Sequence, residues 1–252
     1  MDFEIRPQET KKDKVVDSNR PAMKAGIIPK HPAISIFIGS VGSGKSTLVI
    51  NLLSKPNLYG IDPKTKKPFF DVIFVLTGSD DDLYDNLVDM KIIKEDKIKL
   101  DPTPDDIGKL ISIQRQDIKK KGIDKADKAL IILDDVVDNG KLMRSQEMRT
   151  LFIKPRQLNF SVFLLSQYMN LIPKFMRNNA RNIFFFRGNR SDHEILCDQF
   201  CPSNLNRKTF LKLIHQAVEE RGNETHNFLH INRTKPISER FRRNLNKLIN
   251  VE

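Results

Sequence analysis

The feature that most constrains this chain is a glycine-rich loop between a short apolar run and a stretch of helix-forming residues. Residues 33–38 (AISIFI) predict a strand, and residues 45–53 (KSTLVINLL) predict a helix. The loop between them, GSVGSGKS at 39–46, fits the pattern G-x-x-x-x-G-K-[ST] of a phosphate-binding P-loop. Glycines let successive backbone N–H groups turn inward, and the helix presents its positive end to the same point. The alternative is an ordinary glycine-rich turn, but the flanking strand and helix favour a phosphate site.

The P-loop pattern assigns roles to its polar residues. We expect Lys45 to neutralise the β- and γ-phosphates of a nucleotide and the Ser46 hydroxyl to be a ligand of Mg²⁺. The expected cofactors are ATP and Mg²⁺, because the chain has no Asn-Lys-x-Asp motif that would read guanine. The residues expected to bind the nucleotide are Gly39, Ser40, Val41, Gly42, Ser43, Gly44, Lys45, Ser46 and Thr47.

A second motif, LIILDD at 130–135, places two acids at the end of an apolar strand. This arrangement fits a Walker B strand, whose acid holds a water on Mg²⁺, and we assign that role to Asp134. Asp135 would then orient or deprotonate the attacking water, which is the step that distinguishes hydrolysis from phosphoryl transfer to another substrate. The alternative is an acidic turn after a strand, but the P-loop in the same chain favours the catalytic interpretation.

The rest of the chain alternates between strand and helix patterns. Strands are expected at 71–76, 129–133, 161–165 and 182–186, with a further one at 227–231. Helices are expected at 104–121, between an N-cap at Thr103 and a stop at Gly122, at 141–158, after a capping box of Ser191 and Glu194, and at 205–221. Near-continuous apolar strands separated by helices predict an α/β fold with a doubly wound, mainly parallel sheet of about five or more strands.

Composition narrows the class of protein. A chain of 252 residues is long enough to bury a core, and its apolar runs are far shorter than the roughly 18 residues of a membrane span. We therefore expect a soluble protein without a signal peptide, and two cysteines exclude a disulfide framework. The net charge of +11 favours a polyanionic partner. The expected division is an N-terminal arm at 1–32, a P-loop ATPase domain at 33–231 and a basic C-terminal tail at 232–252.

Four segments together, GSVGSGKST, ALIILDD, SVFLLSQ and IPKFMRNNARNIFFF, resemble the FtsK/HerA superfamily of P-loop ATPases. Within it, the chain is most similar to the genome-packaging ATPases of large eukaryotic DNA viruses, including poxviruses, over about residues 33–190. The resemblance implies that the strand ending in Gln167 lies between the P-loop and Walker B strands, with Gln167 sensing the γ-phosphate and the water. From the residues alone, Gln167 is only a polar residue after an apolar strand. Many members carry Glu where this chain has the shorter Asp135.

The resemblance also implies a homo-oligomeric ring in which an arginine of one subunit reaches the γ-phosphate of the next. We favour Arg156, because the sequence PRQLNFSVFLLSQ leads from it into the strand that ends in Gln167. A solvated arginine on a helix face is the alternative for any single candidate. The other candidates are Arg144, Arg149, Arg177 and Arg181.

Three basic clusters are candidates for DNA contact: residues 233–247, the lysines at 119–128 and the lysines at 64–67. A solvated tail is the alternative for the first cluster. Another set, His193, Cys197 and Cys201, falls on one helix face, but a closed zinc site needs four ligands. A fourth would have to come from His215, His226 or His230, so we favour small thiols that pack the helix.

The resemblance implies an ATP-hydrolysing translocase of double-stranded DNA that packages a viral genome into a preformed capsid. Its implied partners are double-stranded DNA without sequence preference, further copies of itself and a capsid protein, with no membrane. The implied location is the cytoplasm of an infected host cell, in a virus factory, or the virion. The alternatives are a cellular-type FtsK/HerA DNA pump or helicase, a nucleoside or nucleotide kinase, and a non-catalytic nucleic-acid-binding scaffold.

Overall fold

The computed structural model describes residues 20–79, 83–219 and 225–251. Its centre is a sheet of nine strands in the described residues, in the order β3-β2-β4-β5-β1-β6-β7-β8-β9. The first six strands along the chain run parallel, and the last three pair antiparallel. The strands are β1 (Ile34–Ile38), β2 (Val72–Thr77), β3 (Ile98–Leu100), β4 (Ala129–Asp134), β5 (Phe160–Ser166), β6 (Asn182–Phe185), β7 (Leu229–Asn232), β8 (Phe241–Arg243) and β9 (Lys247–Leu248).

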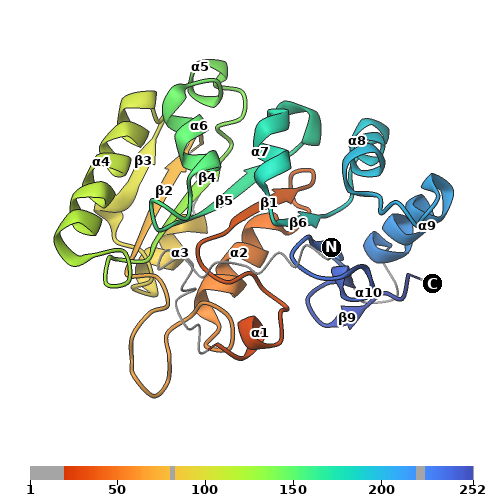
Figure 1. Cartoon of the computed structure of the whole chain (residues 1–252), viewed down its shortest axis with the longest axis horizontal. Helices are drawn as coiled ribbons and strands as arrows, with labels where there is room; N and C mark the ends of the chain where they lie inside the picture. Colours follow the sequence, from red (N-terminus) through yellow and green to blue (C-terminus); the bar gives the residue numbers. More distant parts are fainter. Residues whose placement is uncertain (1–19, 80–82, 220–224, 252) are drawn as a thin grey trace, which may run out of the picture.

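Helices cover both faces of the sheet, so the predicted doubly wound α/β class is confirmed (Figure 1). One face carries α1 (Pro21–Lys24), α2 (Lys45–Ser54) and α3 (Leu83–Asp89). The other carries α4 (Pro104–Lys121), α5 (Gly140–Met143), α6 (Gln146–Ile153), α7 (Lys174–Asn179), α8 (Arg190–Phe200) and α9 (Arg207–Val218). Two short 3₁₀ turns, Glu95–Lys97 and Met169–Leu171, and α10 (Ile237–Arg240) lie in connections.

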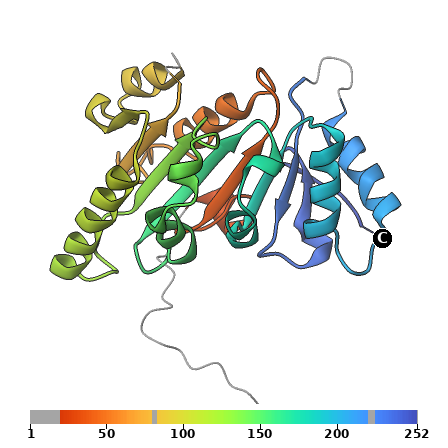
Figure 2. The ribbon, with the colours of Figure 1, turned by 90° about the horizontal axis from the view of Figure 1, so that it is seen from above.

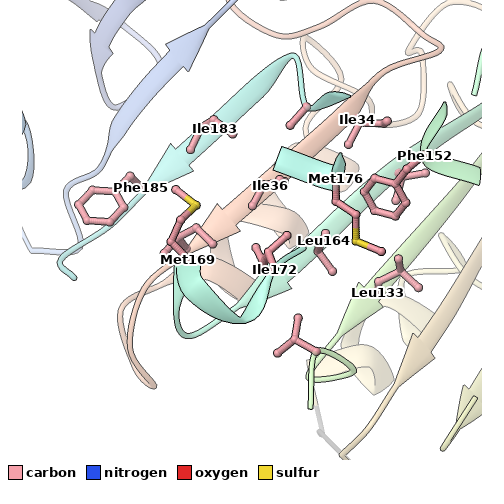
Figure 3. Packing of buried hydrophobic residues seen from close by; sticks show 14 of the residues in the cluster. Ile34, Ile36, Leu133, Phe152, Leu164, Met169, Ile172, Met176, Ile183 and Phe185 are labelled. Carbon is pink, nitrogen blue, oxygen red and sulfur yellow. The ribbon is translucent and has the colours of Figure 1, made fainter. Parts of the chain in front are cut away.

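Two apolar cores follow from the alternation of side chains along each strand. In β1, Ile34, Ile36 and Ile38 face the core under α4–α9, and Phe37 faces the core under α2. Figure 3 shows the first of these cores, where Met176 from α7 lies among side chains of the central strands. Because β1 is buried on both faces, it reads in the sequence as an unbroken apolar run.

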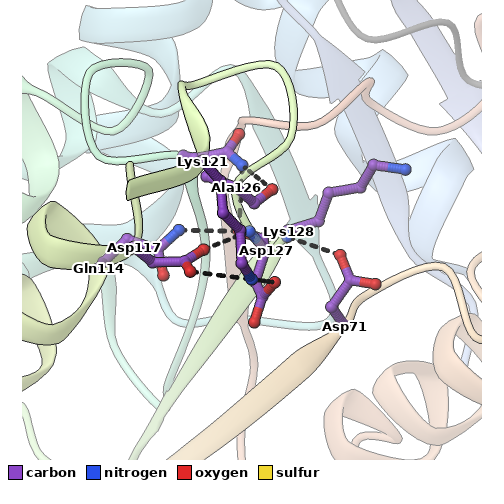
Figure 4. Close-up of polar contacts among 8 residues, drawn as sticks. Asp71, Gln114, Asp117, Lys121, Ala126, Asp127 and Lys128 are labelled. Atoms are coloured by element: carbon purple, nitrogen blue, oxygen red, sulfur yellow. Dashed lines mark hydrogen bonds and ion pairs between the residues drawn. The ribbon is translucent and has the colours of Figure 1, made fainter. Parts of the chain in front are cut away.

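The helix expected at 104–121 forms between the predicted caps. Thr103 and Asp106 make a reciprocal capping box, and Gly122 ends the helix with a positive φ of 78°. Near its C-terminal end, Gln114 donates to the backbone oxygen of Asp127 at 2.7 Å, and Lys121 pairs with Asp117 and Asp127 (Figure 4). These contacts fix the chain that enters β4.

Two helix predictions differ from the structure. Residues 141–158 form two helices instead of one, because Ser145 caps a new helix by accepting from the N–H of Met148 at 3.1 Å. The capping box before α8 consists of Asn189 and Asp192, not Ser191 and Glu194. Asp192 is fully buried and also accepts from the N–H of Met169 at 2.7 Å, so this box ties two connections together.

The ends of the chain pack closely where they are described. Of the expected arm at 1–32, residues 1–19 lie outside the described residues, whereas Met23 is buried in the core under α2. The segment at 232–252, which we expected as a tail, adds β8 and β9 to the sheet in its described residues. Phe241 of β8 is completely buried against Phe210 of α9. Apolar residues among the arginines therefore hold this segment on the domain.

Candidate active site

The candidate site lies at the carboxyl edge of the parallel strands. The backbone N–H of Gly39 donates to the oxygen of Ser166, and Asp134 is level with Leu165 in the adjacent strand. The loop after β1, the end of β5 and the end of β4 therefore emerge together. The order β4-β5-β1 confirms that the strand ending before Gln167 lies between the other two. One strand separates β1 from β4, so their ends are about 10 Å apart.

The backbone conformation and the close packing of the P-loop require glycine at three of its positions. Gly42 and Gly44 have positive φ values of 72° and 96°, which residues with a side chain rarely adopt. At Gly39, an added Cβ would lie 2.6 Å from the hydroxyl of Ser43 and 2.7 Å from the Cβ of Phe186. The loop is therefore folded tightly against the end of β6.

Lys45 begins α2 and turns its ammonium back over the loop. Its Nζ donates to the backbone oxygens of Gly39 at 2.7 Å and Ser40 at 3.0 Å. Burial lowers the pKa of Lys45, and the negative charges of Asp134 and Asp135 act in the opposite direction. The two acids therefore lie within electrostatic reach of the ammonium that is expected to meet the phosphates.

Asp134 is buried at the end of β4, and a tyrosine from a distant segment holds it. The hydroxyl of Tyr84, in α3, donates to Oδ2 of Asp134 at 2.6 Å. The backbone oxygen of Asp134 accepts from the N–H of Gly78 at 2.9 Å. Tyr84 belongs to no local sequence motif and reaches the site only through the pairing of β2 with β4, so the sequence alone does not predict its role.

Asp135 is exposed and has a positive φ of 50°. Its Oδ2 accepts from the hydroxyl of Ser79 at 3.3 Å. Gly78 approaches so closely that a Cβ there would lie 2.3 Å from the backbone oxygen of Asp135. The turn after β2 thus orients Asp135 toward solvent beside the buried Asp134.

Gln167 is half-buried directly after β5, and no described residue hydrogen-bonds to its side-chain amide. The hydroxyl of Ser166 donates to the backbone oxygen of Tyr168 at 2.9 Å and accepts from its N–H at 3.3 Å. This turn fixes the backbone around Gln167, and its amide remains available to a ligand.

His226 also lies at this site, although no sequence motif indicates it. It is exposed, has a positive φ of 59° and precedes β7. A Cβ on Gly44 would lie 3.0 Å from the Cβ of His226, so its loop rests on the P-loop. The P-loop therefore contacts a segment that lies 182 residues further along the chain, from Gly44 to His226.

The donors at this edge fit Mg²⁺. This ion prefers oxygen ligands and usually keeps several waters, taking only one or two carboxylates beside substrate phosphates. Ser46 is half-buried in the first turn of α2, and Asp134 supplies a buried carboxylate. The described residues contain no group of three or more His, Cys, Asp or Glu that would hold a metal unaided, so an ion here depends on phosphates and water.

The set His193, Cys197 and Cys201 has a packing environment in the described residues. Cys197 belongs to the core under α8, and burial raises the pKa of its thiol. The ring of His193 lies 5.1 Å from that of His215, centroid to centroid. His230 is in β7, stacked at 4.5 Å on Phe184, and His226 is on the P-loop. Among the residues that the structure describes, no three or more His, Cys, Asp or Glu side chains are placed to hold a metal ion together, so these histidines do not complete a four-ligand set with the cysteines.

The five candidate arginines occupy different environments. Arg177 donates to the backbone oxygens of Met169 and Ile172, both at 2.8 Å, and so holds a connection. Arg149 lies over the ring of Phe175 at 5.0 Å, and Arg144 is exposed after α5. Arg156 and Arg181 precede β5 and β6, at the amino edge.

Arg156 is separated from the P-loop of its own chain by the length of β5, which has seven residues. At 3.3 Å per residue, that distance is about 20 Å. Because Arg156 precedes β5 and the P-loop follows the parallel strand β1, the two groups lie at opposite edges of the sheet. Figure 2 shows this sheet with helices on either side. Arg156 therefore cannot reach a nucleotide held by the P-loop of its own chain.

The arginines of the C-terminal segment are used within the fold to different degrees. Arg243 is buried and donates to the backbone oxygens of Gln216 at 3.0 Å and Glu219 at 2.9 Å. Arg240 donates to the backbone oxygen of Lys235 at 3.1 Å. Our expectation of a basic tail available to DNA is thus wrong for Arg243, whose guanidinium fastens β8 to the end of α9.

None of the helices in the described part of the chain is both long and apolar enough to cross a membrane.

The chain is similar to a known protein family and to individual viral proteins. The model of a family described as "Poxvirus A32 protein" matches residues 27–232. Protein 015R of Frog virus 3 (isolate Goorha) is 28% identical over 158 residues, covering 61% of this chain and 44% of that protein. Protein 075L of Invertebrate iridescent virus 6 is 27% identical over 154 residues, covering 60% and 53%. The chain thus spans about half the length of these viral relatives.

Among solved structures, the chain is similar to the genome packaging NTPase B204 from Sulfolobus turreted icosahedral virus 2 in complex with ATP-gammaS. The TM-score is 0.55 at 13% identity, over 84% of this chain and 96% of that one. At this identity the likeness shows the fold, and the fold is that of a P-loop NTPase.

Proposed function

Because the chain belongs to the poxvirus A32 protein family, we propose that it is an ATP-hydrolysing translocase of double-stranded DNA that packages a viral genome into a preformed capsid. The observation that carries the ATPase assignment is the convergence of the P-loop, the acids after β4 and Gln167 at one sheet edge. The packaging assignment is supported by family membership and by B204, which has the same fold and is described as a genome packaging NTPase.

Nucleotide binding would begin at the P-loop. The backbone N–H groups of residues 39–47 and the start of α2 surround the place of the phosphates. Lys45 would exchange its bonds to Gly39 and Ser40 for bonds to the β- and γ-phosphates. Ser46 and Asp134 would hold Mg²⁺, the latter through a water, and the ion would neutralise charge on the phosphates.

Hydrolysis needs a water aligned with the γ-phosphate and a group that accepts its proton. Asp135 is exposed beside that position and is oriented by Ser79, so we assign it as the proton acceptor. Gln167, whose amide has no bond to a described residue, would orient the same water. Asp135 is one methylene shorter than Glu, and the close approach of Gly78 fixes the backbone from which its carboxylate would act.

The active site would be completed by a second copy. Arg156 lies at the edge opposite its own P-loop, so a ring that joins one subunit's amino edge to its neighbour's carboxyl edge would bring Arg156 to the neighbour's γ-phosphate. An arginine in this role stabilises the charge of the transition state.

The partners and the location follow from the same proposal. A net charge of +11 supports binding to the DNA backbone without base reading. A capsid protein would anchor the ring, and the protein would act in the virus factory of an infected cell or in the virion. The domain responsible would be residues 33–231, together with the C-terminal strands that pack on it.

ATP turnover with and without double-stranded DNA tests the proposal. We expect turnover that depends on Mg²⁺, is strongly stimulated by duplexes of unrelated sequence and is abolished by Lys45→Ala with an unchanged circular dichroism spectrum. Phosphorylation of an added nucleoside or nucleotide would instead identify a kinase. DNA binding without any turnover would identify a scaffold.

A further inference from the structure

A cavity rich in positive charge lies at the amino edge of the sheet, opposite the P-loop. It has a volume of about 320 Å³ and lies between the chain that enters β1, the turn before β5 and the chain that leaves β7. Its charged lining residues are Lys24, Lys30, Asp124, Arg156, Arg181 and Lys235. Five of these six are cations, so the cavity is suited to an anion. Lys235 is already paired with Glu239 at 3.1 Å.

Arg181 is half-buried in this cavity, as is Lys235, which already has its acidic partner. The position of Arg181 is fixed by the backbone, since its N–H donates to Ile34 at 3.0 Å and its oxygen accepts from Arg233 at 2.8 Å. Within the described ranges of the chain, no residue accepts a hydrogen bond from its guanidinium. Burial lowers the pKa of Arg181, and the positive charge of Arg156 lowers it further. A half-buried cation beside another cation is costly unless an anion pairs with it.

Arg156 and Arg181 face the same space. Both line the cavity described above, and both line an adjoining cavity of about 270 Å³ under residues 152–157. The guanidinium of Arg156 is also without an acceptor among the residues that the structure describes. Two planar guanidiniums with free donors match the tetrahedral oxygens of phosphate, which they bind in a bidentate manner.

We propose that Arg156 and Arg181 together form a phosphate-binding site, with Arg181 as its half-buried anchor and Arg156 as its exposed partner. Two sources share this chemistry: the nucleotide held by a neighbouring copy of the chain and the backbone of a nucleic acid. The existence of the site is independent of the proposed function, whereas the identity of the phosphate rests on it.

The first experiment measures phosphate binding by the full chain in a Lys45→Ala background, which weakens the P-loop as a competing site. Inorganic phosphate and pyrophosphate are titrated by calorimetry and by the rise in Tm. Arg181→Gln should bind about tenfold more weakly or worse, because a charge-assisted hydrogen bond is lost. Arg115→Gln is the matched control, since Arg115 is an exposed arginine on α4. Equal binding by Arg181→Gln and its control overturns the proposal.

A second measurement separates binding from a merely structural role. In phosphate-free buffer, Arg181→Gln should have a Tm equal to or above that of its parent, because an unpaired half-buried charge is removed. Phosphate should raise the Tm of the parent more than that of the variant. Arg181→Lys keeps the positive charge but loses the planar, bidentate guanidinium, so it should bind phosphate with intermediate affinity. A Tm below the parent's in phosphate-free buffer would mean that Arg181 has an internal partner, and the proposal would fail.

The source of the phosphate is identified with an intact P-loop. A lower turnover number for Arg181→Gln at saturating ATP without DNA points to the nucleotide of a neighbouring copy. Weaker duplex binding with a shallower salt dependence points to the nucleic-acid backbone. Failure of the proposed function is recognised separately, because it would appear as phosphorylation of an added nucleoside or as DNA binding without ATP turnover. Neither outcome would change the phosphate titration.

Discussion

Asp134 illustrates at the scale of single residues how a site depends on a contact that no motif contains. The carboxylate of Asp134 is restrained, because it is buried and accepts a hydrogen bond of 2.6 Å from the hydroxyl of Tyr84. A carboxylate that must hold a water on a metal benefits from such restraint, since supporting hydrogen bonds orient metal-binding groups. Tyr84 is therefore a positioning residue for the proposed Mg²⁺ site.

Tyr84→Phe should raise the Mg²⁺ concentration needed for half-maximal turnover by about threefold to tenfold, because a hydrogen bond to a charged group is lost. The matched control is Tyr59→Phe, which removes another buried hydroxyl bond, to the backbone oxygen of Pro29 at 2.7 Å. Both variants should lose stability, but only Tyr84→Phe should change the Mg²⁺ requirement in a titration of ATP turnover. An equal requirement in the two variants would show that Tyr84 is only a packing residue.

At the scale of elements, the turn after β2 controls Asp135 by steric fit. Gly78 has no room for a Cβ, since the backbone oxygen of Asp135 would lie 2.3 Å away. Both the Cβ added at Gly78 and the backbone oxygen of Asp135 are attached directly to the main chain. A side chain at Gly78 would therefore force the end of β2 or the end of β4 to move. The geometry of the acid after β4 is thus set by the element paired beside it.

Gly78→Ala should lower ATP turnover at least about tenfold and the free energy of unfolding by about 1–3 kcal/mol, the usual cost of overpacking. Gly108→Ala is the control, because a Cβ at Gly108 in α4 would meet only the side chain of Glu147 at 3.6 Å. Because Gly108 lies in a helix, Gly108→Ala should increase the free energy of unfolding by about 0.5–1 kcal/mol. Denaturant unfolding and turnover are measured on both, and normal turnover by Gly78→Ala would exclude steric control of Asp135.

The chain that enters β1 carries an element-scale pH dependence. His31 is buried, bonded to Ser161 at 2.8 Å and to Asn159 at 3.0 Å, and burial lowers its pKa to about 4. An unfolded histidine titrates near pH 6.5. Between those two values the unfolded chain binds the extra proton, so the stabilising contribution of neutral His31 is present above pH 6.5 and is lost as the pH falls toward 4.

His31→Gln should therefore reduce the loss of stability between pH 6.5 and pH 4, by up to about 3 kcal/mol. At pH 7 the same variant should be less stable than the parent, because the ring also packs edge-on against Phe70. Denaturant midpoints at a series of pH values provide the test, and parallel profiles for His31→Gln and the parent would contradict it.

At the scale of the whole molecule, the sheet separates the P-loop from Arg156. The distance along β5 means that no rotation of the side chain within one copy brings Arg156 to its own nucleotide. If Arg156 takes part in hydrolysis, as we propose, a complete site exists only between copies.

Turnover per chain should accordingly rise with protein concentration as copies associate. Lys45→Ala and Arg156→Ala should each be nearly inactive, and the latter should bind ATP almost normally, because an arginine acting on transition-state charge affects kcat most. Mixing the two inactive proteins should restore part of the activity at junctions where one copy supplies the P-loop and the other Arg156. Normal turnover by Arg156→Ala alone would assign the role to another arginine.

The sequence by itself determined the P-loop, the alternation of strands and helices, and the acids at the end of β4. These features depend on the local backbone conformation, so short sequence patterns predict them. Examples are the positive φ values of Gly44 and Gly122 and the helix cap at Thr103. The packing of both faces of β1 explains why its run of apolar residues indicated a buried parallel strand.

Only the tertiary structure decided which side chains from distant segments contact the site and which are hydrogen-bonded elsewhere in the fold. Tyr84 and Gly78 reach Asp134 and Asp135 across about 50 residues, through the pairing of β2 with β4. Arg243, one member of a basic cluster in the sequence, donates a hydrogen bond to a backbone oxygen of α9. Arg181, by contrast, lies half-buried beside Arg156. Local sequence contains charge and periodicity, but burial and partners arise from strand order, and these decide what each charged group can do.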